Sequence, residues 1–125
     1  IERLSVKLDS RFWSSATDFI EYSLGICLIK DDEVISFCYA AAVVDGLAEV
    51  DVITEPDFRG RGLANIVSQQ FVRECRRKGI TPTWDCFVNN VGSMKLAERL
   101  GFVQATSYPL YSLNVPVTLI RHTPM

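Results

Sequence analysis

The chain has 125 residues, which is enough for one compact domain and too few for two. Hydrophobic residues make up 48% of it, so it can bury a sizeable core, and this composition argues against intrinsic disorder. The formal net charge of −2 gives no reason to expect attraction to nucleic acid or to an acidic membrane surface. We therefore expect a single domain over residues 1–125 whose partners include neither nucleic acid nor membrane.

The cysteines and the lack of a long apolar run indicate the compartment. None of Cys27, Cys38, Cys75 and Cys86 has CxxC spacing, and each lies among apolar residues. A zinc site or a disulfide framework needs tighter clustering or a smaller chain, so we expect no metal. We interpret the four as buried small hydrophobes in a reducing compartment. No run reaches the ~18 apolar residues of a membrane span and no basic leader is visible, which predicts a cytoplasmic protein.

The first elements are expected to be a strand or arm and then a helix. Residues 1–8 alternate loosely between apolar and polar positions. From Asp9 or Ser10, which are plausible N-caps, apolar residues recur at helical spacing as far as Ile20. Gly25 is expected to stop this helix.

Three strands are predicted next. Two β-rich runs, 26–29 and 34–44, flank a short polar turn and predict a hairpin. Asp45-Gly46 is a second turn signal, and residues 47–54 make the third strand.

The second half of the chain alternates helices and strands. A helix from Leu63 to Lys78 carries its apolar residues on one face and ends at Gly79. A strand over 80–88 follows, and Asn90 can cap a short helix that Gly101 closes. The last two strands are expected at 102–113 and 115–120. This order predicts a mixed α/β domain built around one sheet.

The most informative stretch is the glycine-rich turn before the longer helix, Arg59-Gly60-Arg61-Gly62-Leu63-Ala64. The first N–H groups of a helix have no intrahelical partner, and the helix dipole is positive there. Glycines let successive N–H groups converge and leave no Cβ in the way of a phosphate, while arginines add charge. The pattern indicates a diphosphate site. The alternative is a tight strand-to-helix connection with its arginines in water.

Two nucleotide-binding motifs do not fit this turn. A dinucleotide fingerprint would need a glycine where Asn65 stands, and the Gly-Lys-Ser/Thr of a P-loop is absent.

The turn resembles the Arg/Gln-x-x-Gly-x-Gly/Ala motif of the GNAT superfamily of acyl-CoA N-acyltransferases. Residues 90–102, NVGSMKLAERLGF, look like the second motif of that superfamily, an Asn-led helix ending in Leu-Gly-Phe. The strand segment TWDC at 83–86, with Ser93 and Leu96-Ala97, is similar to the antibiotic-resistance branch typified by the zwittermicin-type acetyltransferases. The resemblance covers roughly residues 47–111.

The resemblance implies the fold. We expect an α/β (α+β) GNAT-like acyl-CoA N-acyltransferase fold, with a mixed, mostly antiparallel sheet flanked by helices. The usual first strand and helix cannot be placed before Asp9, and the chain opens with Ile1, so we expect the C-terminal part of a longer protein. In this fold the strands at 47–54 and 80–88 splay apart, and the pantetheine arm of the cofactor lies in the gap.

The resemblance also implies where acetyl-CoA binds as a cosubstrate. Pantetheine would bond to the strand backbone between Ile53 and Glu55, and the diphosphate would sit on the N–H groups of Arg61 to Ala64. Asn90 and Ser93 would face the pantetheine arm. The expected cofactor-binding residues are Ile53, Thr54, Arg59, Gly60, Arg61, Gly62, Leu63, Ala64, Asn90 and Ser93.

The implied reaction is the attack of a neutral amine on a thioester. A lysine-like ammonium has a pKa of about 10.4, so its deprotonation at neutral pH costs roughly 4–5 kcal/mol. A positioned base is therefore worth several powers of ten in rate. Glu49 and Asp51 are the candidate bases, because alternation with apolar residues places both carboxylates on one face of the strand. The other interpretation is that both line a solvated face.

The sequence departs from the resemblance at one position. Many GNAT enzymes carry a tyrosine on the second-motif helix that protonates the leaving thiolate, and this chain has Ala97 there. A thiol with a pKa near 8.5 loses only about 2 kcal/mol when it leaves unprotonated at pH 7. Ser93 is our catalytic candidate for this role, and Cys86, Tyr108 and Tyr111 are other substitutes.

Three further residues are considered for a role in the site. Trp84 either lines an acceptor pocket or packs in a core strand. Cys86 as an acylated nucleophile needs a base beside it, and His122 is expected to lie in a tail.

The sequence thus predicts an N-acetyltransferase that moves the acetyl group of acetyl-CoA to a primary amine of a small molecule. The alternative is a catalytically weak CoA-binding module, a sensor or interaction domain of a larger protein, which Ala97 favours. A homodimer is one assembly that we consider. The acceptor itself has no motif in the sequence.

Overall fold

The computed structural model describes residues 24–112 and 115–124. Its elements are β1 (Gly25–Lys30), β2 (Glu33–Val44), β3 (Leu47–Thr54), the short 3₁₀ helix η1 (Pro56–Phe58), α3 (Leu63–Lys78), β4 (Thr81–Phe87), α4 (Val91–Arg99), β5 (Phe102–Ser112) and β6 (Val115–Pro124). None of the helices in these residues is both long enough and apolar enough to cross a bilayer. The arm predicted over 1–8 and the helix predicted from Asp9 or Ser10 lie outside the described ranges.

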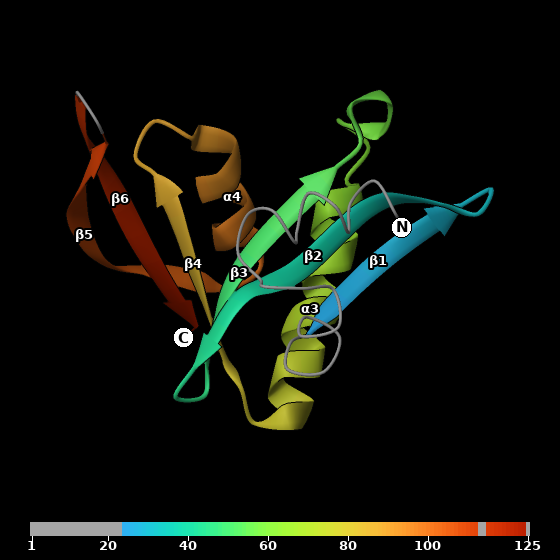
Figure 1. The fold of residues 1–125 in the computed structure, drawn as a ribbon, viewed down its shortest axis with the longest axis horizontal. Helices are drawn as coiled ribbons and strands as arrows, with labels where there is room; N and C mark the ends of the chain where they lie inside the picture. Colours follow the sequence, from blue (N-terminus) through green and yellow to red (C-terminus); the bar gives the residue numbers. More distant parts are fainter. Residues whose placement is uncertain (1–23, 113–114, 125) are drawn as a thin grey trace.

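The six strands form one sheet in the order β1-β2-β3-β4-β6-β5. Among these described strands, only the β3–β4 pair is parallel, and the other neighbours are antiparallel. A parallel pair needs a long crossover connection, which α3 supplies. Figure 1 shows α3 behind β1 to β3 and α4 beside β4. The predicted mixed, mostly antiparallel sheet with flanking helices is confirmed.

The turns of the β1–β2 and β2–β3 hairpins use left-handed backbone conformations. Asp31 and Asp32 have φ of 51° and 62°, and Asp45 and Gly46 have φ of 52° and 76°. Two consecutive positive φ values give a two-residue turn whose twist matches that of the flanking strands, and Asp and Gly tolerate this conformation best. The predicted strand pairs at 26–29 with 34–44, and at 47–54, are confirmed within one or two residues.

The sheet opens between β3 and β4. Their pairing is limited to Leu47 with Thr81, Ala48 with Pro82 and Glu49 with Thr83. Beyond Thr83, β4 pairs with β6 on its other side. Figure 1 shows the two strands meeting at one end and diverging toward the other. The splay that the family resemblance implies for these strands is therefore present.

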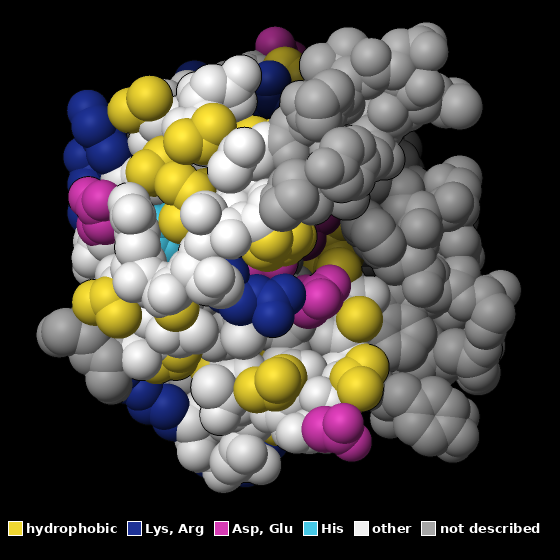
Figure 2. Space-filling model, turned by 90° about the vertical axis from the view of Figure 1, so that its left-hand side faces the viewer, with side chains coloured by type: hydrophobic (Ala, Val, Ile, Leu, Met, Phe, Trp, Pro, Cys, Tyr) yellow, Lys and Arg dark blue, Asp and Glu magenta, His cyan; other side chains and the backbone are white. Residues whose placement is uncertain are grey.

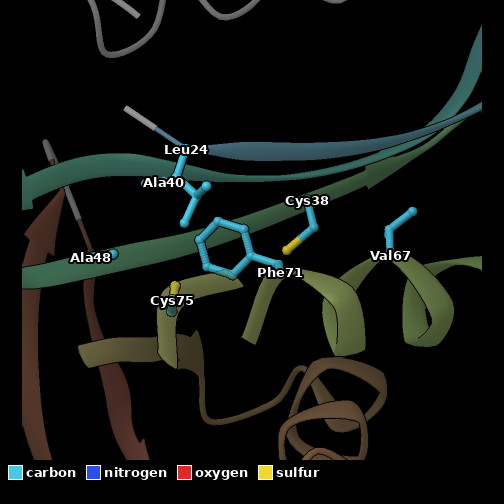
Figure 3. Packing of buried hydrophobic residues seen from close by; sticks show 7 residues of the cluster. All are labelled: Leu24, Cys38, Ala40, Ala48, Val67, Phe71 and Cys75. Carbon is cyan, nitrogen blue, oxygen red and sulfur yellow. The ribbon is translucent and has the colours of Figure 1, made fainter. Parts of the chain in front are cut away.

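The larger part of the core lies between α3 and the strands β1 to β3. Phe71 and Val67 of α3 are fully buried in one cluster with Cys38 and Ala40 of β2. Figure 3 shows the Phe71 ring reaching from α3 to the strands, between the sulfur-bearing side chains of Cys38 and Cys75. Burial raises the pKa of Cys38 to about 12, so this cysteine stays a neutral thiol. One apolar face of α3 therefore holds the helix against the sheet.

The structure corrects two expectations from the sequence. Gly25 is the first residue of β1, and the helix that it was expected to stop lies outside the described residues. Cys27 is exposed, because its side chain alternates away from α3, whereas the other three cysteines are buried as predicted. His122 is not in a tail: β6 continues to Pro124 and pairs with β4, which leaves His122 fully buried.

We expect Phe71→Ala to lower the free energy of unfolding by about 3–5 kcal/mol, because it empties a fully buried ring position. Ile66→Ala is the matched control on the same helix, since Ile66 is 48% exposed, and its effect should stay within about 0.5 kcal/mol. Chemical denaturation followed by circular dichroism measures both. Equal losses in the two variants would contradict this account of the core.

Candidate active site

The turn before α3 presents its backbone amides outward. Gly60 and Gly62 have φ of 76° and 77°, so both positions need the left-handed freedom of glycine. Gly62 is the N-cap of α3, and the helix gains its first backbone bond when Ile66 N–H donates to Gly62 O at 3.2 Å. No acceptor among the described residues is bonded to the N–H groups of Leu63 and Ala64. The first turn of α3 is thus an anion-binding arrangement.

The two arginines brace the turn against the end of β3. Arg59 Nε donates to Thr54 O at 3.1 Å, and an Arg61 terminal nitrogen reaches Asp57 O at 3.4 Å. The Arg61 guanidinium also lies 5.2 Å from the centre of the Phe58 ring. Both arginines are exposed, so their charge stays at the rim of the turn while their contacts fix its shape.

A cavity of about 690 Å³ opens beside the turn. It is lined by Val52, Ile53, Thr54, Phe58, Arg59, Gly60, Gly62, Leu63, Ala64 and Asn90. Most of the residues predicted to bind the cofactor therefore meet around one space. Arg61 does not line this space, because its side chain turns toward Phe58.

A second cavity, of about 670 Å³, lies where β3 and β4 diverge. It shares Val52, Ala64 and Asn90 with the first, so the two spaces adjoin. Its other lining residues are Ala41, Glu49, Val50, Asp51, Trp84, Asp85, Cys86, Phe87, Gly92, Ser93, Leu96 and Leu119. The predicted candidates Glu49, Asp51 and Ser93 all lie on this wall.

This second cavity reaches both faces of the sheet. Trp84 and Cys86 point to the α4 side, where they pack with Ala97. Because side chains alternate along a strand, Asp85 points to the opposite face. Both sets line the same cavity, so the gap between the strands connects a thiol- and hydroxyl-lined side with a carboxylate-lined side.

Backbone parity decides which β3 groups face the gap. Glu55 N–H donates to Ile35 O of β2 at 2.8 Å, so it is already used. Bonded pairs alternate in an antiparallel ladder, so Ile53 also bonds to β2, whereas Val52 and Thr54 face β4. A contact from Ile53 to the cofactor would thus come from its side chain. Val52 was not among the residues predicted from sequence, and only the register against β2 identifies it.

The two candidate bases differ in how their carboxylates are held. One oxygen of Asp51 accepts from the Tyr39 hydroxyl at 2.8 Å and the other accepts from Val52 N–H at 2.9 Å. Glu49 is 58% exposed, and its carboxylate lies 3.9 Å from a terminal nitrogen of Arg121. Glu49 is therefore the candidate whose oxygens are more open to an incoming proton.

An ion pair that the sequence did not predict lies on the carboxylate side. Arg121 binds Asp85 through Nε and a terminal nitrogen, both at 3.0 Å, and the Tyr108 hydroxyl also donates to Asp85. Figure 2 shows basic and acidic side chains in contact near the middle of the face that holds β5 and β6. Burial alone would raise the pKa of Asp85, but the bonds from Arg121 and Tyr108 hold it below its ordinary value. Asp85 is thus a structural anion.

The first turn of α4 forms the opposite wall. The Asn90 side chain accepts from Ser93 N–H at 3.1 Å, so the predicted cap is confirmed. The Trp84 indole N–H donates to Ser93 Oγ at 2.9 Å. Trp84 is 3% exposed, which confirms that it packs in a core strand, and it also lines the second cavity. Its role in an acceptor pocket stays a prediction. Ala97 is fully buried and cannot present a polar group.

We expect Asp85→Asn to lower the free energy of unfolding by about 1–3 kcal/mol at neutral pH, because it removes the charged partner of Arg121. The folded pKa of Asp85 is depressed, so its stabilisation is present above the unfolded value of about 3.9 and is lost as the pH falls through the folded value. The difference in free energy of unfolding between wild type and variant should therefore become smaller at acid pH. Urea unfolding at several pH values checks this, with the exposed Glu98→Gln as the charge control. A difference in free energy of unfolding that does not change with pH would contradict it.

Comparison with known proteins agrees with this geometry. The family model described as GNAT acetyltransferase matches residues 2–111. YdfB of Bacillus subtilis strain 168, described as an uncharacterized N-acetyltransferase, is 35% identical over 100 residues, which are 80% of this chain and 38% of that protein. The ribosomal protein bS18-alanine N-acetyltransferase of Salmonella typhimurium is 30% identical over 98 residues, covering 75% of this chain and 66% of the relative.

The fold is also that of solved acetyltransferase structures. The structure of YncA from Salmonella typhimurium with its cofactor acetyl-CoA has a TM-score of 0.73 and 18% identity, over 86% of this chain and 66% of that one. The chain spans 38% and 66% of the lengths of its two curated relatives. By the family match over residues 2–111, the chain belongs to the GNAT acetyltransferase family.

Proposed function

We propose that the protein is an N-acetyltransferase that transfers the acetyl group of acetyl-CoA to a primary amine of a small molecule by direct attack on the thioester. The observation that carries this proposal is the split between β3 and β4. The two strands separate after the pair Glu49–Thr83. The gap connects the first turn of α3, where the N–H groups of Leu63 and Ala64 have no acceptor among the described residues, with a face lined by carboxylates. The relatives named as N-acetyltransferases and the acetyl-CoA bound by YncA support it.

The cofactor would bind along the path of the two cavities. Its diphosphate would accept from the N–H groups at the start of α3, with Arg59 and Arg61 at the rim. Its pantetheine arm would lie beside β3 and bond to the Val52 carbonyl and the Thr54 N–H like an added strand, because the Val52 N–H already donates to Asp51 and the Thr54 carbonyl already accepts from Arg59. Asn90 lines both cavities and would face this arm. The thioester then lies in the second cavity.

The acceptor amine would enter from the carboxylate-lined face. Glu49 takes a proton from the ammonium, directly or through water, and passes it to solvent, and the nitrogen lone pair then attacks the carbonyl carbon. The nitrogen of the tetrahedral intermediate gives its extra proton to Glu49. Collapse of the tetrahedral intermediate breaks the C–S bond, and the electron pair leaves with the CoA sulfur. Asp51 would hold its carboxylate beside the amine, since Tyr39 and Val52 fix the position of that carboxylate. Ser93 would face the sulfur from the α4 side.

Several finer expectations stay predictions. They are the small size of the acceptor, the likeness to the zwittermicin-type branch, a cytoplasmic location, a homodimer and the absence of a metal, nucleic-acid or membrane partner. An amine-bearing antibiotic is one acceptor to assay first, because of the TWDC segment at 83–86.

We expect Gly62→Asp to weaken CoA binding by about 100-fold or more, because a carboxylate at the phosphate seat repels the diphosphate. Gly46→Asp is the matched control: its φ is 76° against 77° for Gly62, and a Cβ at either position meets nothing within 4 Å. Both variants should lose similar stability, but only the first should lose affinity. Isothermal titration calorimetry with CoA measures this, and unaltered affinity in Gly62→Asp would exclude the first turn of α3 as the diphosphate site.

We expect Glu49→Gln to lower kcat by about 100-fold or more at neutral pH, with little change in the KM for acetyl-CoA, because the amine loses its proton acceptor. Asp51→Asn should have a smaller effect on kcat, since both of its oxygens already accept hydrogen bonds. Glu33→Gln, at the exposed β1–β2 turn, is the control. A thiol-release assay over an amine panel measures all three. Full activity in Glu49→Gln would exclude Glu49 as the base.

A further inference from the structure

We infer that Trp84 is a positioning residue: its indole N–H fixes the Ser93 hydroxyl so that the hydroxyl donates its own hydrogen to the sulfur of CoA. This inference rests on the proposed function, because it requires the CoA sulfur to lie in the cavity between β3 and β4. It assigns to Trp84 a role beyond filling the core.

The direction of one hydrogen bond carries the argument. The indole nitrogen can only donate, so Ser93 Oγ accepts in its 2.9 Å bond with Trp84 Nε1. The hydroxyl hydrogen of Ser93 must therefore go to another partner. The Cys86 thiol lies beside Ser93, and burial raises the pKa of Cys86, so it stays a thiol. A thiol sulfur is a weak acceptor, which leaves the hydrogen available to a stronger one.

Ser93 is held from both ends. Its backbone N–H donates to the Asn90 side chain at 3.1 Å, which sets its place in the first turn of α4. Trp84 is 3% exposed and its ring lies 5.9 Å from that of Phe102, centre to centre, so the indole has no room to turn. Ser93, Trp84 and Cys86 all line the second cavity. The hydroxyl is thus oriented before any ligand arrives.

A donor at this point acts on the bond that breaks. When the C–S bond of the tetrahedral intermediate is cleaved, the electron pair goes to sulfur, and negative charge develops there. The Ser93 hydroxyl stabilises this charge by a hydrogen bond and keeps its own proton, while the proton of the amine goes to Glu49. The same bond must favour the thiolate over the thiol of bound CoA, and so lower the pKa of that thiol.

The titration of bound CoA tests this without knowledge of the acceptor. Thiolate absorbance is followed against pH for the protein–CoA complex, with the desulfo-CoA complex as the blank. We expect the thiol pKa of bound CoA to be about one to two pH units higher in Ser93→Ala than in the wild type. Trp84→Phe should raise it in the same direction, and Trp84→Phe in the Ser93→Ala background should add nothing.

Phe71→Leu is the matched control, because Phe71 is fully buried in the core cluster between α3 and β1 to β3, which contains neither Trp84 nor Ser93. It should lower stability and leave the thiol pKa of bound CoA unchanged. Equal thiol pKa values in the wild type and Trp84→Phe, or independent effects of Trp84→Phe and Ser93→Ala, would overturn the inference and leave the proposed function standing. Failure of the wild type to bind CoA in calorimetry would overturn both.

Discussion

The point at which the pairing of β3 and β4 stops sets where the two cavities lie. Backbone N–H and C=O groups normally need partners, and an unpaired strand edge inside a sheet is costly. Beyond Thr83, β4 meets this need by pairing with β6. Within residues 24–112 and 115–124, no strand pairs with the facing edge of β3 beyond Glu49, and the Val52 N–H donates instead to the side chain of Asp51. An edge kept open in this way is suited to an extended ligand.

The same opening separates two kinds of charge. At one end, the amides of the first turn of α3 and the rim arginines suit a diphosphate. At the other, Glu49, Asp51 and Asp85 line the cavity, with Arg121 bound to Asp85. Under the proposed function, an anionic cofactor and a cationic amine would approach one cavity from these two sides. The sheet keeps the two charge environments apart, and the gap between β3 and β4 connects them.

Local chemistry in the sequence determined where the helices and strands begin and end, and the shape of the turn before α3. The turns at 31–32 and 45–46, the start of α3 at Leu63 and the cap at Asn90 all depend on residues within a few positions of one another. Positive φ values at Gly60 and Gly62 follow from the same short-range logic. The period-2 alternation around Glu49 and Asp51 placed both carboxylates on one cavity wall, as predicted.

Tertiary structure alone decided which strands become neighbours and in what register. The bond from Arg121 to Asp85 joins β6 to β4, and nothing near either residue predicts the other. His122 is buried only because β6 pairs with β4 as far as Trp84. Whether the backbone groups of Val52 face the gap likewise depends on the register of β3 against β2. Short-range patterns fix how each segment folds, but pairing between distant segments fixes which atoms face the cavity.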